Sequence, residues 1–163
     1  MTHPDFPVTP AIRVLRDGRI PFTPHLYDYE EHGGAHHAAK ALGVPLHDVV
    51  KTLVMETEDR KPLLILMHGD LEVSTKQLAR TLGTKKVSPC DAATAQKQTG
   101  YMVGGISPLG TRSSMRVYVE ASILDLPVIY LNGGKRGFLI AVTPADLQKA
   151  LRITPVHVSI PIP

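Results

Sequence analysis

The sequence predicts a single α/β domain in which a mixed, barrel-like sheet is surrounded by short helices. Segments with strand character and segments with helix character follow one another without the regular alternation of a doubly wound sheet, and this order favours a mixed sheet that could close into a barrel. The 163 residues are enough to bury one sizeable core. No internal repeat or low-complexity linker divides the chain, so the domain is expected to span residues 1–163.

Capping residues and terminal glycines predict the helices. Thr9 and Thr143 each precede a proline, and this pair favours a helix start because threonine accepts from free backbone amides and proline has its φ preset. Glycines at the far ends stop most of these segments. The expected helices run from Thr9 to just before Gly18, from Ala35 to Leu42, from Ser74 to Leu82, from Asp91 to Thr99 and from Thr143 to Leu151.

Apolar runs between polar or glycine-rich segments predict the strands. The segment Ile20 to Tyr29 is expected to be an irregular or edge strand, since it contains prolines. Clearer strands are expected at Val49 to Glu56, Pro62 to Met67, Val117 to Glu120, Val128 to Leu131 and Phe138 to Val142. The tail from Thr154 to Pro163 has three prolines and no helical period, so we expect it to be extended and loosely held.

Composition narrows the class of protein. The net charge of +3 permits a polyanionic partner without requiring one. The single cysteine, Cys90, excludes an internal disulfide and suits a reducing compartment. The first residues lack a secretory pattern, and no apolar run reaches the roughly 18 residues that span a bilayer. We therefore expect a soluble, cytoplasmic protein with no membrane partner.

Two glycine-rich loops are the most informative feature of the chain. They occupy residues 104–110 and 132–137, with strand-like sequence between them. Glycine pairs mark places where the backbone needs a positive φ or where another group approaches the main chain closely. The two loops could therefore face one pocket, or each could be a tight turn between strands. Neither matches a P-loop or a dinucleotide-binding turn.

Lys51 is unusual because it lies in an otherwise apolar strand. By alternation it shares a face with Leu53 and Met55. A lysine on such a face either extends its stem over the edge of the core or directs its charge into a cleft, where it could bind a phosphate or a polarised carbonyl. Both interpretations stay open.

The cluster of His32, His36 and His37 is the obvious candidate for a metal site. A spacing of four would place His32 and His36 on one helix face, but the intervening Gly33-Gly34 argues against a helix there. A solvated loop is the favoured interpretation. A metal-dependent hydrolase that uses these three histidines is kept as an alternative.

No nucleophile stands out in the sequence. Asp91 follows Cys90 directly and would raise the thiol pKa, so we interpret Cys90 as structural. Ser107 lies in a glycine loop that is not a nucleophile elbow, and it is better interpreted as a hydrogen-bond donor. No carboxylate pair suggests general acid–base catalysis.

Three segments together resemble the YbaK/EbsC family. They are Lys51-Thr52-Leu53, the stretch from Thr99 to Gly110, and Gly133 to Gly137, in the family's order and spacing. The resemblance runs from about Thr9 to Leu151. It implies a free-standing aminoacyl-tRNA deacylase, related to the editing domain of prolyl-tRNA synthetase, with a barrel-like mixed sheet and no cofactor or metal.

The resemblance also implies a substrate and partners. The best-known branch hydrolyses cysteinyl-tRNA(Pro), and cysteinyl-tRNA(Cys) is a second candidate substrate. In that branch the substrate's own thiol attacks the ester carbonyl. The expected partners are the acceptor end of a mischarged tRNA and, in a docked form, prolyl-tRNA synthetase. The true amino acid, the tRNA and the oligomeric state stay open.

Site residues follow from the same resemblance. Lys51 is implied to hold the terminal adenosine's phosphate or the ester, and Tyr27 to hydrogen-bond the aminoacyl end. Together with Gly105 they form the expected catalytic set. The expected substrate-binding residues are Gly104, Ile106 and Ser107 from the first loop and Gly133, Gly134, Lys135 and Arg136 from the second.

One position departs from the family pattern. Leu139 stands where relatives carry an aspartate that helps to organise the site. This departure supports a second alternative, a non-catalytic tRNA-binding or synthetase-accessory module of the same fold.

Overall fold

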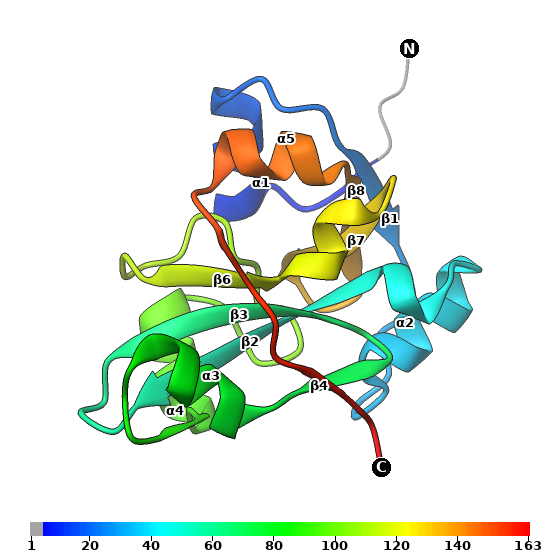
Figure 1. Ribbon diagram of the computed structural model, residues 1–163. Coiled ribbons are helices and arrows are strands. Elements are labelled where there is room, and N and C mark those ends of the chain that lie inside the picture. Colours follow the sequence, from blue (N-terminus) through cyan, green and yellow to red (C-terminus); the bar gives the residue numbers. More distant parts are fainter. Residues whose placement is uncertain (1–4) are drawn as a thin grey trace.

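One mixed sheet of eight strands forms the centre of the molecule (Figure 1). The computed structural model describes residues 5–163. The sheet path is β1-β8-β7-β2-β3-β6-β9, and β5 also pairs with β2. The strands are β1 Thr23–Leu26, β2 Val49–Thr57, β3 Pro62–His68, β5 Val87–Pro89, β6 Arg116–Glu120, β7 Ile129–Lys135, β8 Phe138–Val142 and β9 Thr154–Val156.

The pairing confirms the mixed, barrel-like sheet that the sequence predicts. β2 pairs antiparallel with β3 and parallel with β7, and β3 pairs parallel with β6. Within the described residues the outer strands β1 and β9 do not pair with each other, so the sheet stays open.

The helices begin and end where the caps predict. The side chains of Thr9, Ser74, Asp91 and Thr143 each accept a hydrogen bond from the third backbone amide that follows. The helices are α1 Pro10–Asp17, α2 Gly34–Leu42, α3 Thr75–Leu82, α4 Ala92–Thr99 and α5 Pro144–Ala150, with 3-10 turns at Leu46–Asp48 and Ala121–Asp125. No helix of the described chain is both long and apolar enough to cross a membrane.

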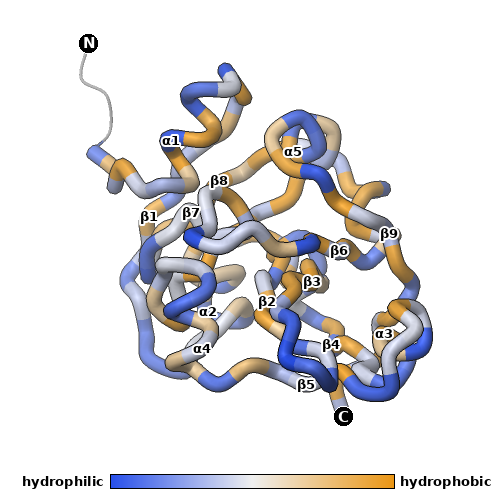
Figure 2. The backbone as a smooth tube through the Cα atoms, turned by 90° about the vertical axis from the view of Figure 1, so that its left-hand side faces the viewer, coloured by the Kyte–Doolittle hydropathy of each residue, from blue (hydrophilic) through white to orange (hydrophobic). Residues whose placement is uncertain are grey.

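Alternation along β2 and β3 separates two apolar cores. Val50 and Val54 of β2 pack into the larger core, together with residues of α1 and α5. Met55 of β2 faces the other way, into a smaller core that includes Leu78 of α3. Figure 2 shows apolar stretches on the central strands β3 and β6 and also on α1 and around α5. Successive side chains of β2 therefore point to opposite sides of the sheet.

The C-terminal tail is extended, as expected, but it is not loosely held. β9 pairs with β6, and β10 (Ser159–Pro161) pairs with the short strand β4 (Leu71–Val73). Between these strands the buried Glu120 carboxylate accepts hydrogen bonds from the backbone amides of Val158, at 2.7 Å, and Ser159, at 3.1 Å. Val158 is fully buried. The expectation of a loose tail was wrong because this carboxylate and the buried valine anchor it.

Strand boundaries near the second glycine loop also differ from the expectation. β7 continues to Lys135, four residues beyond the expected end at Leu131. The short strands β4 and β5 were not expected, since three residues give no clear alternation. The extension of β7 changes the second glycine loop from a free loop into part of the sheet.

Candidate active site

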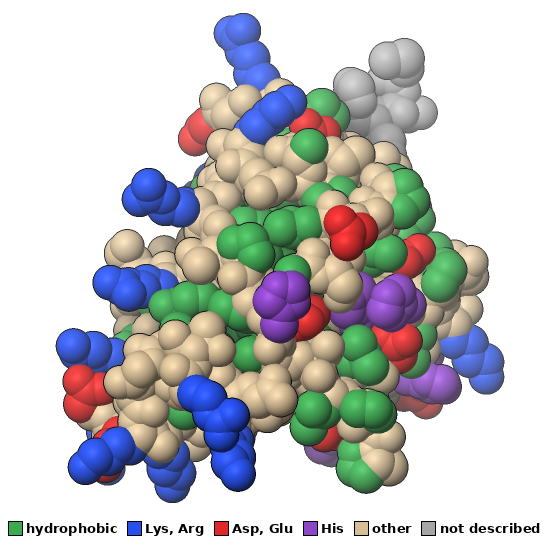
Figure 3. Space-filling view, viewed as in Figure 1, with side chains coloured by type: hydrophobic (Ala, Val, Ile, Leu, Met, Phe, Trp, Pro, Cys, Tyr) green, Lys and Arg blue, Asp and Glu red, His purple; other side chains and the backbone are tan. Residues whose placement is uncertain are grey.

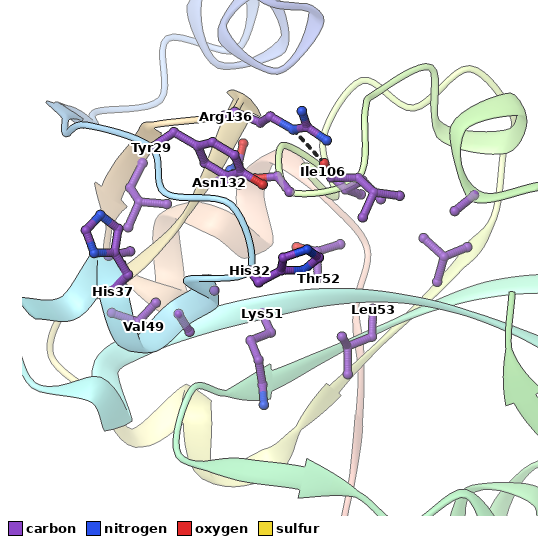
Figure 4. A pocket seen from close by; sticks show the side chains of 18 of the residues that line it. Tyr29, His32, His37, Val49, Lys51, Thr52, Leu53, Ile106, Asn132 and Arg136 are labelled. Carbon is purple, nitrogen blue, oxygen red and sulfur yellow. Dashed lines mark hydrogen bonds between the residues drawn. The ribbon is translucent and has the colours of Figure 1, made fainter. Parts of the chain in front are cut away.

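A cavity of about 710 Å³ lies over β2, between the first glycine loop and the segment that leads into α2 (Figure 4). Its floor is the stretch of β2 from Val49 to Met55. Of the expected catalytic and substrate-binding residues, Lys51, Tyr27, Gly104, Ile106 and Arg136 line it. Polar and charged side chains around it include Tyr29, Glu30, Glu31, His32, His37 and Asn132.

The two glycine loops meet at this cavity, so the structure confirms that they face one pocket. Asn132 Nδ2 donates to the carbonyl oxygen of Gly104 at 3.1 Å, and Arg136 Nε donates to the carbonyl oxygen of Val103 at 2.9 Å. The backbones of the two loops also approach each other directly at Gly105. A Cβ added at Gly105 would lie 2.8 Å from the backbone nitrogen of Arg136. Glycine is therefore needed at Gly105 because the loops approach closely, and not because its φ is positive.

The second loop is a β-bulge followed by a tight hairpin turn. The register between β7 and β8 shifts between Asn132 and Lys135. Asn132 Oδ1 accepts from the backbone amides of Gly134, at 2.7 Å, and Lys135, at 3.0 Å, which holds the bulge. Gly134 has a φ of +100° and Gly137 a φ of +77°. Gly134 and Lys135, with Gly133, shape this turn without lining the cavity, whereas Arg136 does line it.

The first loop contributes an apolar wall and little free hydrogen-bonding capacity. Ile106 lines the cavity, but Ser107 is fully buried and its Oγ accepts from the backbone amide of Leu109 at 3.1 Å. The amide of Gly105 donates to the carbonyl oxygen of Met102 at 2.8 Å. Ser107 and Gly105 therefore support the loop from behind.

Two tyrosines from the segment after β1 line the cavity. Tyr27 is partly buried, and burial is the main cause that raises the pKa of its phenol, followed by the proximity of Tyr29. The Arg136 guanidinium lies over the Tyr29 ring, 5.1 Å from its centroid (Figure 4). Tyr29 and Asn132 were not predicted as site residues from the sequence. An asparagine before a glycine pair is a turn signal that could have indicated the latter.

The Lys51 side chain points away from the glycine loops and towards β4 (Figure 4). Its Nζ donates to the carbonyl oxygen of Leu71 at 2.6 Å. Burial lowers the pKa of the ammonium, while Glu72 and Asp70 oppose that shift. The shared face with Leu53 is confirmed, and the charge has a backbone partner at the edge of the smaller core.

The structure does not bring His32, His36 and His37 together around one point. His37 is engaged on both ring nitrogens, with the Asp28 carbonyl oxygen at 2.8 Å and the Glu30 carboxylate at 2.9 Å. His32 and His36 are exposed. Figure 3 shows histidine and acidic side chains gathered on the side of α2 and the β3–β4 turn, with most lysines and arginines along the opposite edge.

Another group, His47, His68 and Asp70, does lie close together among the described residues. The two imidazole rings stack with centroids 3.8 Å apart, and His47 Nδ1 contacts Asp70 at 2.9 Å. Both ring nitrogens of the buried His68 are engaged, with the His47 carbonyl oxygen and with Ser122 Oγ, each at 2.7 Å. These hydrogen bonds join the three residues into a network at the β3–β4 turn.

Cys90 lines the cavity but is not an activated thiol. Burial, followed by the nearby Glu56, raises the pKa of the thiol to about 11. Asp91, the neighbour in sequence, contributes least to this rise of the thiol pKa. The thiol is protonated at neutral pH, as a structural cysteine would be.

Leu139 forms part of an apolar wall of the cavity. It is 4% exposed and packs with Ala38, Ala39 and Val49. A carboxylate at this point would be largely desolvated. This side of the cavity therefore offers shape and no charge.

Comparison with known proteins identifies the class. Residues 30–150 match the family described as the aminoacyl-tRNA editing domain. The chain is 29% identical over 137 residues, 83% of its length and 84% of the relative's, to a protein of Enterococcus faecalis named "Putative Cys-tRNA(Pro)/Cys-tRNA(Cys) deacylase EbsC". It is also 29% identical over 86 residues, 53% of this chain, to the proline–tRNA ligase of Brachyspira hyodysenteriae, of which the match covers 15%.

The chain belongs to the aminoacyl-tRNA editing domain family. The resemblance drawn from the sequence is therefore confirmed. The fold agrees as well. A solved structure described as a putative trans-editing enzyme for prolyl tRNA synthetase superposes with a TM-score of 0.79 at 21% identity, covering 94% of this chain and 99% of the other.

Proposed function

We propose that this protein is a free-standing aminoacyl-tRNA deacylase that removes cysteine from cysteinyl-tRNA(Pro). The observation that carries the proposal is the pair of glycine loops joined by Asn132 over a cavity with an apolar floor and a polar rim. The name of the Enterococcus relative supports this substrate and includes cysteinyl-tRNA(Cys) as the second candidate.

The cavity suits the acceptor end of a charged tRNA. Arg136 and Tyr29 form a cationic, aromatic rim on which a terminal adenosine could stack and a phosphate could be neutralised. Ile106 and Leu139 leave an apolar space that suits a small side chain. Lys51 can serve the ester or the phosphate if its ammonium leaves the Leu71 carbonyl, a weak neutral acceptor compared with a phosphate.

Substrate-assisted cleavage fits the side chains of the cavity. The substrate's thiol sulfur attacks its own ester carbon, the C–S bond forms, and the bond from that carbon to the ribose 3′ oxygen breaks. The thiol proton ends on the leaving hydroxyl through solvent, and the products are free tRNA and a cyclic thiolactone. The protein's part is positioning and electrostatic stabilisation. The protonated Cys90 does not compete as a nucleophile.

The implied partners are a mischarged tRNA and, in a docked form, prolyl-tRNA synthetase. The proline–tRNA ligase of Brachyspira hyodysenteriae itself contains a segment that is similar to this chain. Such an activity belongs in the cytoplasm, where tRNA is charged. Leu139 favours one competing function, an accessory tRNA-binding module, because the expected carboxylate is missing.

Deacylation of a panel of charged tRNAs tests the proposal. Purified protein is incubated with cysteinyl-, alanyl- and seryl-tRNA(Pro) and with cysteinyl-tRNA(Cys), and ester loss is compared with the spontaneous rate. Rapid loss from a cysteinyl-tRNA is expected. Binding of tRNA without accelerated loss of any ester would instead support the accessory module.

A further inference from the structure

Thr52 is the polar residue of β2 that faces the glycine loops. Lys51 and Leu53 point to the opposite side, towards β4, whereas Thr52 points from β2 to the side on which Ile106 lies (Figure 4). Its neighbours on the same face, Val50 and Val54, belong to the larger apolar core. The alternation of the strand therefore places one hydroxyl in an otherwise apolar stretch of the cavity floor.

The Thr52 hydroxyl is buried and has no hydrogen-bond partner among the described residues. Other buried threonines differ in this respect. Thr9 Oγ1 donates to the carbonyl oxygen of Gly133, and Thr99 Oγ1 donates to that of Ala95 at 2.7 Å. A buried polar group without a partner costs about 1–3 kcal/mol. An unsatisfied hydroxyl on a residue that lines a cavity is explained if a ligand supplies its partner.

We propose that the Thr52 hydroxyl binds the polar atom of the substrate's amino-acid side chain, a thiol or a hydroxyl on the β-carbon. This inference rests on the proposed deacylase function. Thr52 lines the cavity, and a change of its χ1 rotamer is the movement that would turn the hydroxyl towards a bound ligand. The rotation breaks no hydrogen bond, because Oγ1 makes none in the free protein.

The surroundings favour the side chain as the binding partner. Val50, Val54 and Ile106 offer no competing hydrogen bond near Thr52. The groups suited to ribose and phosphate, such as Arg136 and Asn132, belong to the glycine-loop rim instead. A small side chain that enters the floor therefore meets one hydroxyl, which distinguishes cysteine or serine from alanine. Thr52 positions the thiol and does not take its proton.

The test compares Thr52→Val, which keeps the shape and removes the hydroxyl, with Thr52→Ser, which keeps the hydroxyl. Thr52→Val is expected to lower kcat/KM on cysteinyl-tRNA(Pro) about tenfold, the effect of losing one neutral hydrogen bond. Thr52→Ser is expected to retain most of the activity. Thr52→Val should unfold at a temperature no lower than the wild type, since the hydroxyl satisfies nothing in the free protein.

Thr57→Val is the matched control, because Thr57 lies on the same strand and does not line this cavity. A second measurement avoids turnover. Adenosine analogues that carry cysteine or alanine through an amide are used as inhibitors, and Thr52→Val should weaken only the cysteinyl analogue.

Equal weakening of both analogues, unchanged kcat/KM in Thr52→Val, or a Thr52→Ser variant as impaired as Thr52→Val would each overturn the inference. Failure of the proposed function looks different, because the wild type itself would then cleave no member of the panel.

Discussion

Asn132 fixes both glycine loops with one side chain. Its Nδ2 donates to the Gly104 carbonyl oxygen at 3.1 Å, while its Oδ1 accepts from the amides of Gly134 and Lys135 in its own loop. A single planar amide thus sets the bulge of β7 and the position of the first loop relative to it. The shape of the cavity depends on this link, since Gly104 and Asn132 both line it.

Asn132→Asp should separate the two roles of this side chain. The carboxylate still accepts from the two amides, but it cannot donate to the Gly104 carbonyl and repels it instead. We expect deacylation to fall about tenfold, with a small change in melting temperature, because net hydrogen bonds of this kind are worth about 1 kcal/mol. Steady-state deacylation and thermal unfolding measure the two effects. Full activity in the folded variant would mean that the loop link is dispensable.

Lys51→Met tests the ammonium without removing the apolar stem. If the charge serves the ester or the phosphate, the loss of one preorganised electrostatic contact costs roughly 3–4 kcal/mol, or about a hundredfold or more in rate. The exposed Lys61→Met on the adjoining hairpin is the control. Turnover near the wild-type rate in Lys51→Met would remove Lys51 from the site and leave the Leu71 contact as a structural one.

Gly105→Ala should reduce activity more than stability. The added methyl group would lie 2.8 Å from the backbone nitrogen of Arg136 and 2.9 Å from the carbonyl carbon of Lys135, so it pushes the second loop away. Gly18→Ala at the end of α1, where φ is an ordinary −83°, is the matched control. If deacylation and melting temperature of Gly105→Ala fell in parallel, the loop contact would be merely structural.

The sequence predicted the elements that depend on local chemistry. Thr9, Ser74 and Asp91 cap helices because their side chains accept from amides within three residues. The side of the sheet to which Lys51 points was predicted from the two-residue period of a strand. Whether the sheet closes into a barrel depends on pairing between strands that are far apart in the chain. The sequence therefore could not show that β1 and β9 stay unpaired among the described residues.

The site was only partly predictable for the same reason. The Leu71 partner of Lys51 lies on a three-residue strand that no periodicity reveals. Ser107 and Lys135, which are expected substrate-binding residues, do not line the cavity, because Ser107 is buried in a hydrogen bond and Lys135 follows a bulge. These outcomes depend on long-range contacts, which a local pattern does not contain.

The Cys90 thiol should titrate near pH 11. Its pKa is raised above the ordinary value of 9.0, so between about pH 9 and pH 11 the unfolded chain has released the proton that the native state still holds. The contribution of this thiol to the free energy of unfolding is therefore fully present below pH 9, and it is lost as the pH rises through 11. Alkylation rates of the native protein against pH measure the thiolate fraction, with a free thiol as reference. A plateau below pH 9 would contradict the assignment.

Removal of candidate metal and nucleophile groups should leave activity largely intact. Cys90→Ser and single alanine substitutions at His32, His36 and His37 are expected to retain most of the wild-type rate, and chelators should have little effect. In the structure the three histidines do not converge. A hundredfold loss in one of these variants, restored by added Zn²⁺, would revive the metal-dependent alternative.

The most demanding prediction compares cysteinyl- with seryl-tRNA(Pro). The two side chains differ by one atom, so contacts in the cavity alone discriminate by roughly 1–3 kcal/mol. Attack by the substrate's own side chain adds a chemical difference, since a thiol yields far more nucleophile at neutral pH than a hydroxyl does. We expect kcat on cysteinyl-tRNA to exceed that on seryl-tRNA by more than binding accounts for, with trapping of the cyclic thiolactone as the direct readout. The apolar wall that Leu139 forms would also suit the methyl side chain of alanine, which gives a preference for alanyl-tRNA a physical basis. If alanyl-tRNA, which has no nucleophilic side chain, is the better substrate, cyclisation is not the mechanism, and water must attack an ester held in the same cavity.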